Sequence, residues 1–327
     1  MDRHSNNLPR LDEKRFRKKL LAWFDQHKRD LPWRQDRDPY RVWLSEIMLQ
    51  QTRVAAVQEH YLRFLQRFPT VEKLAASRKS SILAAWSGLG YYRRARMLHA
   101  AARKVVREHA GTFPQNAAEL RTLPGVGRYT AAAVASIAFG EAVAVVDGNV
   151  ERVLGRVFGR PIAGEELWQK AQTLLDLKRP GDFNQGVMEL GATLCLPRQP
   201  KCLLCPVSGL CATRGELPRA AKSIQQKKRE IHYALSLRDN SVFLVQRPST
   251  LSLMPGMWEL PEIAATKVNG QAQVTLRHSI TVTDYLVRVA PLPAPEIEGG
   301  RWITRARLAR LPLTGLTRKI LRRVKVI

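Results

Sequence analysis

Apolar side chains recur every three or four positions through the first 211 residues, which is the spacing of amphipathic helices. The period is clear over five alanine-rich stretches, at residues 40–65, 80–108, 115–121, 128–139 and 165–195. Two of these stretches carry capping signals, because Asp38-Pro39 precedes one of them and Gly140 follows another. Residues 11–211 are therefore predicted to be almost wholly helical.

The pattern changes after residue 211. Residues 212–228 are polar and basic without an apolar period, which predicts a linker. Short alternating or β-branched runs, typical of strands, follow at 231–237, 241–247, 273–277 and 285–290. A helix is expected to close the chain after Gly315. We therefore expect a mainly α region over residues 1–211, a linker over 212–228 and an α/β module over 229–327.

The charge balance is strongly basic. The 327 residues include 54 lysines and arginines against 28 acidic residues, a formal net charge of +26. Such an excess favours a polyanionic partner such as nucleic acid, because binding releases condensed counterions. Charge alone does not separate DNA from RNA, from an acidic membrane surface, or from a basic protein without such a partner.

Two further features concern location. No apolar run approaches the roughly 18 residues that a transmembrane helix needs. The first twenty residues, MDRHSNNLPRLDEKRFRKKL, lack the apolar core of a secretory signal. We therefore expect a protein without a membrane partner in the reducing cytoplasm, associated with the nucleoid if the cell is bacterial.

All four cysteines lie within one 17-residue stretch, at Cys195, Cys202, Cys205 and Cys211. Thiols gathered so closely in a long chain indicate one shared ligand and not scattered disulfides. Zinc sites usually combine two close cysteine pairs, whereas only Cys202 and Cys205 form such a pair here. The spacing therefore favours an iron–sulfur cluster bound by four thiolates over zinc or four unligated thiols.

A glycine-containing turn, LPGVGRYT at residues 123–130, separates two predicted helices. Gly125 and Gly127 permit a tight hairpin whose backbone N–H groups can approach a phosphate, and basic Arg128 follows them. This arrangement favours a helix–hairpin–helix grip on a DNA backbone. A plain interhelical turn would show the same two glycines.

Two carboxylates are candidates for chemistry. Glu46 shares its helix face with Trp43 and Leu49, and apolar surroundings raise a carboxyl pKa so that a general acid keeps its proton. Asp147 begins another predicted helix, where it either caps the helix or faces a developing cation. A salt-bridged Glu46 and a purely capping Asp147 are the structural alternatives. As a pair, the two would suit cleavage of a glycosidic bond.

Five motifs together resemble one family. SEIMLQQT, GLGYYRRAR, LPGVGRYT, VVDGNV and the cysteine loop occur in the order found in the endonuclease III superfamily of helix–hairpin–helix DNA glycosylases. Within it the chain most resembles the MutY-type adenine DNA glycosylases, densely over about residues 15–211. The resemblance implies a monomer that excises adenine mispaired with 8-oxoguanine or guanine in double-stranded DNA, after flipping the base out of the helix.

The resemblance also implies the catalytic roles. Glu46 would protonate the adenine N7 and help to activate the water, and Asp147 would stabilise the positive sugar, assisted by the Tyr129 hydroxyl. Bifunctional relatives have a lysine at the position of Tyr129, whose amine attacks the sugar before the strand is cut. A tyrosine therefore implies a monofunctional enzyme. The four cysteines would hold one 4Fe–4S cluster.

The same resemblance implies which residues contact DNA. Gln51 and Tyr91 match residues that enter the helix at the lesion, where a flat ring can replace lost stacking. Without the resemblance, Tyr91 would be assigned to core packing. The family lines its adenine pocket at the positions of Leu31, Trp33, Arg34 and Glu189. Of these, Glu189 would accept the hydrogens of the adenine amino group.

Residues 229–327 resemble the Nudix-like domain with which these glycosylases recognise 8-oxoguanine, through MPGMWELPE at 254–262 and LRHSITVTDYLVRV at 276–289. The family commonly has Phe-Ser-His where this chain has Ile280, Thr281 and Val282. The sequence therefore does not predict a preference between 8-oxoguanine and guanine. The competing functions are a bifunctional glycosylase and lyase for oxidised pyrimidines and a non-catalytic DNA-binding iron–sulfur protein.

Overall fold

The computed structural model describes the chain except for residues 1–10, 218–226, 249, 252, 269–271 and 281–282. Thr281, Val282 and most of the predicted linker lie outside the described residues, as does the Ile280 side chain. The chain divides into two compact units, Met1–Tyr61 with Ala101–Ala220 and Leu62–Ala100 with Ala221–Ile327. The predicted domain limits near residues 211 and 229 stay a prediction.

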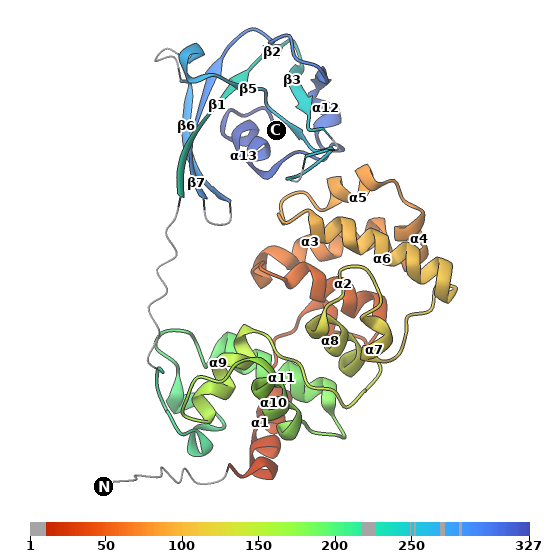
Figure 1. Cartoon of the computed structure of the whole chain (residues 1–327), viewed down its shortest axis with the longest axis vertical. Coiled ribbons are helices and arrows are strands. Elements are labelled where there is room, and N and C mark those ends of the chain that lie inside the picture. Colours follow the sequence, from red (N-terminus) through yellow and green to blue (C-terminus); the bar gives the residue numbers. More distant parts are fainter. Residues whose placement is uncertain (1–10, 218–226, 249, 252, 269–271, 281–282) are drawn as a thin grey trace. The chain divides into compact units, whose positions relative to one another are not determined.

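The first unit is helical (Figure 1). Its elements are α1 (Glu13–His27), a 3-10 turn (Pro32–Arg34), α2 (Pro39–Leu49), α7 (Ala117–Leu120), α8 (Arg128–Ala138), α9 (Gly148–Val157), α10 (Gly164–Leu174) and α11 (Pro180–Thr193). Two helices, α3 (Val54–Arg67) and α6 (Arg93–His109), run from one unit into the other. The predicted helical character of residues 11–211 is confirmed.

Three of the five predicted stretches are pairs of helices and not single ones. The 40–65 stretch breaks after Leu49, the 80–108 stretch breaks after Ala85 at the end of α5 (Lys79–Ala85), and the 165–195 stretch breaks after Leu174. At the first break Gln51 has a φ of 55°, and at the second Gly90 and Tyr91 have φ of 69° and 47°. Left-handed backbone cannot continue an α-helix, so each of these two breaks ends the helix whatever the apolar period predicts.

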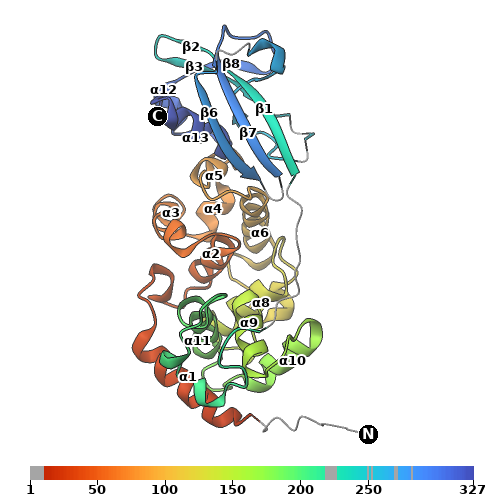
Figure 2. The ribbon, with the colours of Figure 1, turned by 90° about the vertical axis from the view of Figure 1, so that its left-hand side faces the viewer.

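One core of this unit is built from α1, α9, α10 and α11. Phe16 on α1 meets Phe183 on α11 with ring centroids 6.3 Å apart, and Val153 and Leu154 on α9 are buried in the same cluster. Gly181 brings α11 against α8, because a Cβ there would lie 2.6 Å from the Ser136 carbonyl oxygen. This packing places α11 beside both α8 and α9, and Figure 2 shows the three helices within the helical part of the chain.

The second unit combines helices with two four-stranded sheets. Its helices are α4 (Val71–Ala76), α5, α12 (Arg305–Leu308) and α13 (Gly315–Arg323). One sheet has the order β5-β1-β7-β6, in which β1 (Lys227–Leu235) runs parallel to β7 (Thr283–Pro291), and β6 (Val274–Ile280) and β5 (Glu262–Ile263) form the edges. In the other, β2 (Leu237–Arg238), β4 (Trp258–Glu259) and β8 (Gly300–Thr304) pair with β3 (Ser241–Gln246). The predicted α/β character of the C-terminal residues is confirmed.

Contacts inside this second unit join its helical and β segments. Ser87 and Tyr92 both donate hydrogen bonds to the Leu313 carbonyl, at 3.2 and 3.1 Å, and Arg318 donates from Nε to the Ser87 hydroxyl at 3.0 Å. The closing helix is present as predicted, with Ile320 fully buried.

Among the described helices, none combines the length and the apolarity that crossing a bilayer requires.

Candidate active site and cysteine pocket

Glu46 lies on α2 with only 6% of its surface exposed. Its Oε2 accepts a 2.6 Å hydrogen bond from the Tyr129 hydroxyl of α8. Burial raises the pKa of Glu46 to about 7, while the Tyr129 hydrogen bond and the Arg34 guanidinium oppose that rise and the nearby Asp147 adds to it. The predicted apolar environment is confirmed, and Glu46 carries its proton for much of the time near neutral pH.

Asp147 precedes α9 and caps it. Its Oδ1 accepts hydrogen bonds from the backbone N–H groups of Asn149 and Val150, at 2.9 and 2.8 Å, and its Oδ2 accepts one from the Asn149 side-chain amide at 2.9 Å. The capping interpretation is therefore confirmed. Capping does not exclude a catalytic role, because three donors hold the carboxylate in one orientation and the Asp147 charge reaches Glu46.

Arg152, one turn along α9, holds Asn149 in place. Its Nη2 donates to the Asn149 side-chain oxygen at 2.7 Å and to the Gly191 carbonyl at 2.8 Å, and its Nε donates to the Cys195 carbonyl at 2.8 Å. Continuous hydrogen bonds thus run from the Asp147 carboxylate to the first cysteine. Sequence reasoning missed Asn149 and Arg152, although their three-residue spacing on the helix that Asp147 caps is a usable signal.

Glu189 lies on α11 and is 1% exposed, in a group with two arginines. Its oxygens accept four hydrogen bonds, from the Arg29 backbone and side chain and from Arg34. Burial opposes its ionisation, but these bonds outweigh burial and hold the pKa of Glu189 below its ordinary value. Four bonds fill the acceptor positions of a carboxylate, so an adenine amino group would have to displace one of them.

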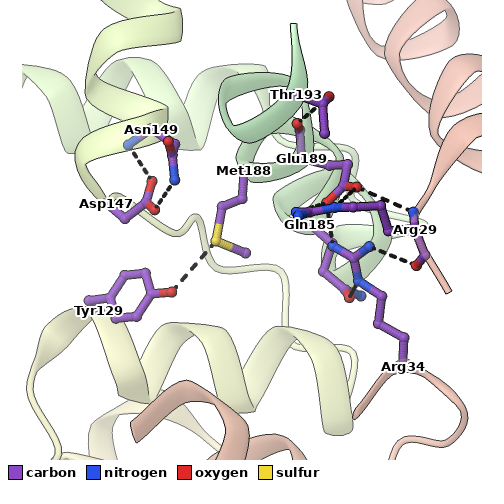
Figure 3. A network of polar contacts seen from close by, with 9 residues as sticks. All are labelled: Arg29, Arg34, Tyr129, Asp147, Asn149, Gln185, Met188, Glu189 and Thr193. Atoms are coloured by element: carbon purple, nitrogen blue, oxygen red, sulfur yellow. Dashed lines mark hydrogen bonds and ion pairs between the residues drawn. The ribbon is translucent and has the colours of Figure 1, made fainter. Parts of the chain in front are cut away.

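Figure 3 shows this group with Met188 between it and Tyr129. The Tyr129 hydroxyl lies 3.6 Å from the Met188 sulfur, and Arg34 donates from Nε to the Gln185 side-chain oxygen at 3.1 Å. Gln185 and Met188 lie on α11 with Glu189. The sequence analysis missed them because neither belongs to a recognisable local motif. The role of Glu189 as the adenine acceptor stays a prediction, and Gln185 is a second polar side chain beside it.

The other predicted pocket and DNA residues are placed as follows. Leu31 and Trp33 are buried, and Trp33 packs edge-on against Tyr61 with ring centroids 5.4 Å apart. Gln51 is exposed in the first unit. Tyr91, in the second unit, is 47% exposed and has the Arg94 guanidinium 5.4 Å from its ring centroid, so the core-packing alternative for Tyr91 is wrong.

The predicted hairpin lies between α7 and α8. Gly125 has a φ of 77°, which glycine adopts without strain, and Gly127 is the N-cap of α8. A Cβ on Gly127 would meet nothing within 4 Å, and no side chain caps the start of α8 at this residue. Arg128 instead forms two hydrogen bonds with Glu165, at 2.6 and 3.0 Å, and stacks 4.0 Å over Trp168.

The four cysteines line one pocket. Arg156, Leu194, Pro200 and Lys201 lie on its wall beside them. Burial raises the pKa of the Cys205 thiol to about 11 and also raises that of Cys202, so these sulfurs need a bound cation to become thiolates at neutral pH. Within the described part of the chain, no three His, Cys, Asp or Glu side chains converge on a single metal ion.

Residues 44–175 match the HhH-GPD superfamily of base excision DNA repair proteins. A human adenine DNA glycosylase is 52% identical over 214 residues, which cover 61% of this chain and 39% of the human protein. An adenine DNA glycosylase of Buchnera aphidicola from Baizongia pistaciae is 34% identical over 257 residues, covering 75% of this chain and 71% of that protein.

The chain belongs to the adenine DNA glycosylase family. It spans about two fifths of the length of the human relative (39%). Among solved structures, a thermostable thymine-DNA glycosylase is 36% identical, with a TM-score of 0.59 over 62% of this chain and 96% of that one. The helical fold is therefore shared with a glycosylase named for a different base, so the fold alone does not identify the base.

Proposed function

We propose that the chain is a monofunctional DNA glycosylase that hydrolyses the N-glycosidic bond of adenine mispaired with 8-oxoguanine or guanine. The observation that carries this proposal is the 2.6 Å hydrogen bond between Tyr129 and the buried Glu46, with the Asp147 charge nearby. This arrangement supplies a carboxylic acid near neutral pH together with a fixed carboxylate. The family membership supports adenine as the base.

The reaction would proceed with the flipped adenine beside Glu46. The Glu46 carboxyl gives its proton to N7, the bond between C1′ and N9 breaks, and its electron pair leaves with neutral adenine. The Asp147 carboxylate, held by Asn149 and Val150, stabilises the positive charge on the sugar. Water then adds to C1′ and returns a proton to Glu46, which restores the acid.

Tyr129 supports the monofunctional reaction over the lyase alternative. A strand-cutting lyase needs an amine that forms a Schiff base with C1′, and a phenol cannot do so. The Tyr129 hydroxyl instead donates to Glu46, and this bond tunes the acid. The non-catalytic alternative leaves the raised pKa of Glu46 without a role.

We propose further that the cysteine pocket holds one 4Fe–4S cluster. In such a cluster each of four thiolates binds a separate iron, which suits four sulfurs that surround a pocket and do not converge on a point. The bound cluster would supply structural order to residues 195–211 and would place Arg198 and Lys201 beside DNA. The experiment for this part is an absorbance band near roughly 400 nm in anaerobically purified protein.

The test of the reaction is single-turnover excision on duplexes with adenine opposite 8-oxoguanine and opposite guanine, with thymine opposite guanine as a comparison. We expect abasic sites from both adenine duplexes that become strand breaks only after alkali. Glu46→Gln, which keeps the side-chain shape, should slow excision by about 10² to 10⁴. Unchanged excision in that variant would disprove the assigned acid, and adduct trapping by borohydride would restore the lyase alternative.

A further inference from the structure

Arg156 on α9 has no role in the reaction above, yet it is only 4% exposed. Its guanidinium contacts residues 195–197, which are the first arm of the cysteine loop (residues 195–211). Nη1 donates to the Cys195 sulfur at 3.2 Å and to the Leu196 carbonyl at 2.7 Å, and Nη2 donates to the Pro197 carbonyl at 3.1 Å. Three hydrogen bonds therefore fix this arm to the helix that carries the Asp147 cap.

The backbone carbonyl of Arg156 forms hydrogen bonds with the other arm of the loop, the segment around residues 211–213. The Arg156 carbonyl accepts hydrogen bonds from the Thr213 hydroxyl at 2.8 Å and from the Thr213 N–H at 3.2 Å. The neighbouring Val157 carbonyl accepts from the Ala212 N–H at 3.1 Å. One residue thus joins the chain just after the first cysteine to the chain at the last one.

The charge of Arg156 is not matched by a carboxylate. Its hydrogen-bond acceptors are backbone carbonyls and a cysteine sulfur, and no ion pair of the described residues includes it. A buried cation without a counter-charge is costly, and proteins usually supply one. Arg156 also lines the pocket with the four cysteines, where a thiolate-bound cluster would place negative charge directly beside it.

We propose that Arg156 retains the cluster by closing both arms of the cysteine loop and by serving as the buried counter-charge of its thiolates. This inference rests on the proposed cluster and adds a residue that is not itself a ligand. A hydrogen bond and a positive charge at a ligand sulfur stabilise the more reduced cluster. Arg156 therefore protects the cluster from oxidation as well as from loss of iron.

The test compares three purified full-length variants with the parent chain. Arg156→Met keeps the apolar stem and removes the charge and the donors, and Arg156→Lys keeps the charge and loses the planar fork. Arg160→Met is the matched control, because Arg160 follows the same helix but is exposed and paired with Glu166. The readouts are iron and sulfide per chain, bleaching of the roughly 400 nm band under a chelator or ferricyanide, and the melting temperature.

We expect Arg156→Met to lose its cluster about ten times faster than the parent or more, Arg156→Lys to be intermediate, and Arg160→Met to match the parent. If Arg156→Met does not fold, faster loss from Arg156→Lys at an unchanged melting temperature carries the same conclusion. Parental occupancy and parental loss rates in the Arg156 variants, or equally fast loss from Arg160→Met, would overturn the proposal. Absence of iron from the parent itself would overturn the proposed cluster as well.

Discussion

At the scale of single residues, Glu46 is the group whose surroundings change its chemistry most. Burial raises the pKa of Glu46, the Tyr129 hydrogen bond lowers it, the Asp147 charge raises it and the Arg34 charge lowers it, and the result is a pKa of about 7. A general acid is most effective when its pKa lies near the working pH. The hydrogen bond from Tyr129 is thus one of the contributions that keep the pKa of Glu46 near neutrality.

The first prediction concerns the pH dependence of excision. Only protonated Glu46 can donate, so the single-turnover rate should be constant below about pH 7 and fall about tenfold per unit above it. Tyr129→Phe removes a hydrogen bond that lowers this pKa, so its falling limb should move to higher pH. Rates measured between about pH 5.5 and 9 on one adenine duplex test both statements, and an unmoved limb in Tyr129→Phe would contradict the coupling.

A second prediction concerns stability. The pKa of Glu46 is about 7 when folded against an ordinary value of 4.5, so between these values the folded state binds more protons and stability falls as pH rises. Glu46→Gln has no proton to lose. Its free energy of unfolding should equal that of the parent at about pH 4.5 and exceed it by about 2 to 4 kcal/mol above pH 7.

Denaturant titrations of the two proteins at both pH values measure this difference. A gap between Glu46→Gln and the parent that is the same at low and high pH would show that the carboxyl is not strained by burial. The expected difference is the free energy of folding that is lost when a buried acid with a raised pKa must ionise.

At the scale of elements, the sequence predicted where α9 begins but did not predict which distant residues its arginine side chains contact. The start of α9 and its cap at Asp147 were predicted, because the cap residue and the apolar period are both local signals. Arg152 has a local partner in Asn149, but the partners of Arg152 and Arg156 outside α9 lie 39 to 57 residues away along the chain. No local pattern encodes such contacts, so both arginines were missed.

The same reasoning explains the other successes and misses. Helices, strands and the cysteine cluster were predictable because composition and spacing carry them. The break within the 40–65 stretch was not, because the apolar period continues across Gln51, whose backbone is left-handed, whereas the glycines of SGLG (87–90) do signal a turn within the 80–108 stretch. Arg128 was expected to face phosphate, and its pairing with Glu165 on α10 depends on how two helices pack.

A third prediction uses the packing of α11 against α9. A Cβ on Gly191 would lie 2.6 Å from the Asn149 Cβ and 3.3 Å from Arg152 Nη2, so Gly191→Ala must displace the hydrogen bonds that orient Asp147. Excision should fall by about 10² at unchanged cysteine ligation. Stability should fall by about 1 to 3 kcal/mol, although alanine is the better helix former.

Gly186→Ala on the same helix is the matched control for Gly191→Ala. A Cβ at Gly186 would lie 3.4 Å from the Leu20 side chain, an ordinary contact. Its excision rate should equal that of the parent, and its stability should be equal or up to about 1 kcal/mol higher. Equal effects of the two substitutions on excision would contradict the role given to the Asp147 orientation.

At the scale of the whole molecule, we expect the net charge of +26 to dominate the proposed association with DNA. Each phosphate neutralised by a lysine or arginine releases counterions, so affinity should decline linearly on a log–log plot against salt. For about six to ten such contacts the loss between 50 and 200 mM salt is about 10³ to 10⁵. Binding of an undamaged duplex measured over this salt range is the fourth prediction, and a flat dependence would exclude an electrostatic grip.

The first unit is discontinuous along the chain, and this has a consequence for its synthesis. The partners of α1 are late residues: Arg179 pairs with Asp25 at 2.6 Å, and the Leu174 carbonyl accepts from Arg17 at 2.9 Å. A ribosome that adds about 5 to 20 residues per second makes them roughly eight to thirty seconds after α1. During that interval the apolar face of α1, with Phe16 and Leu20, has no native cover in the nascent chain. The first described helix to be made is thus among the last to be buried.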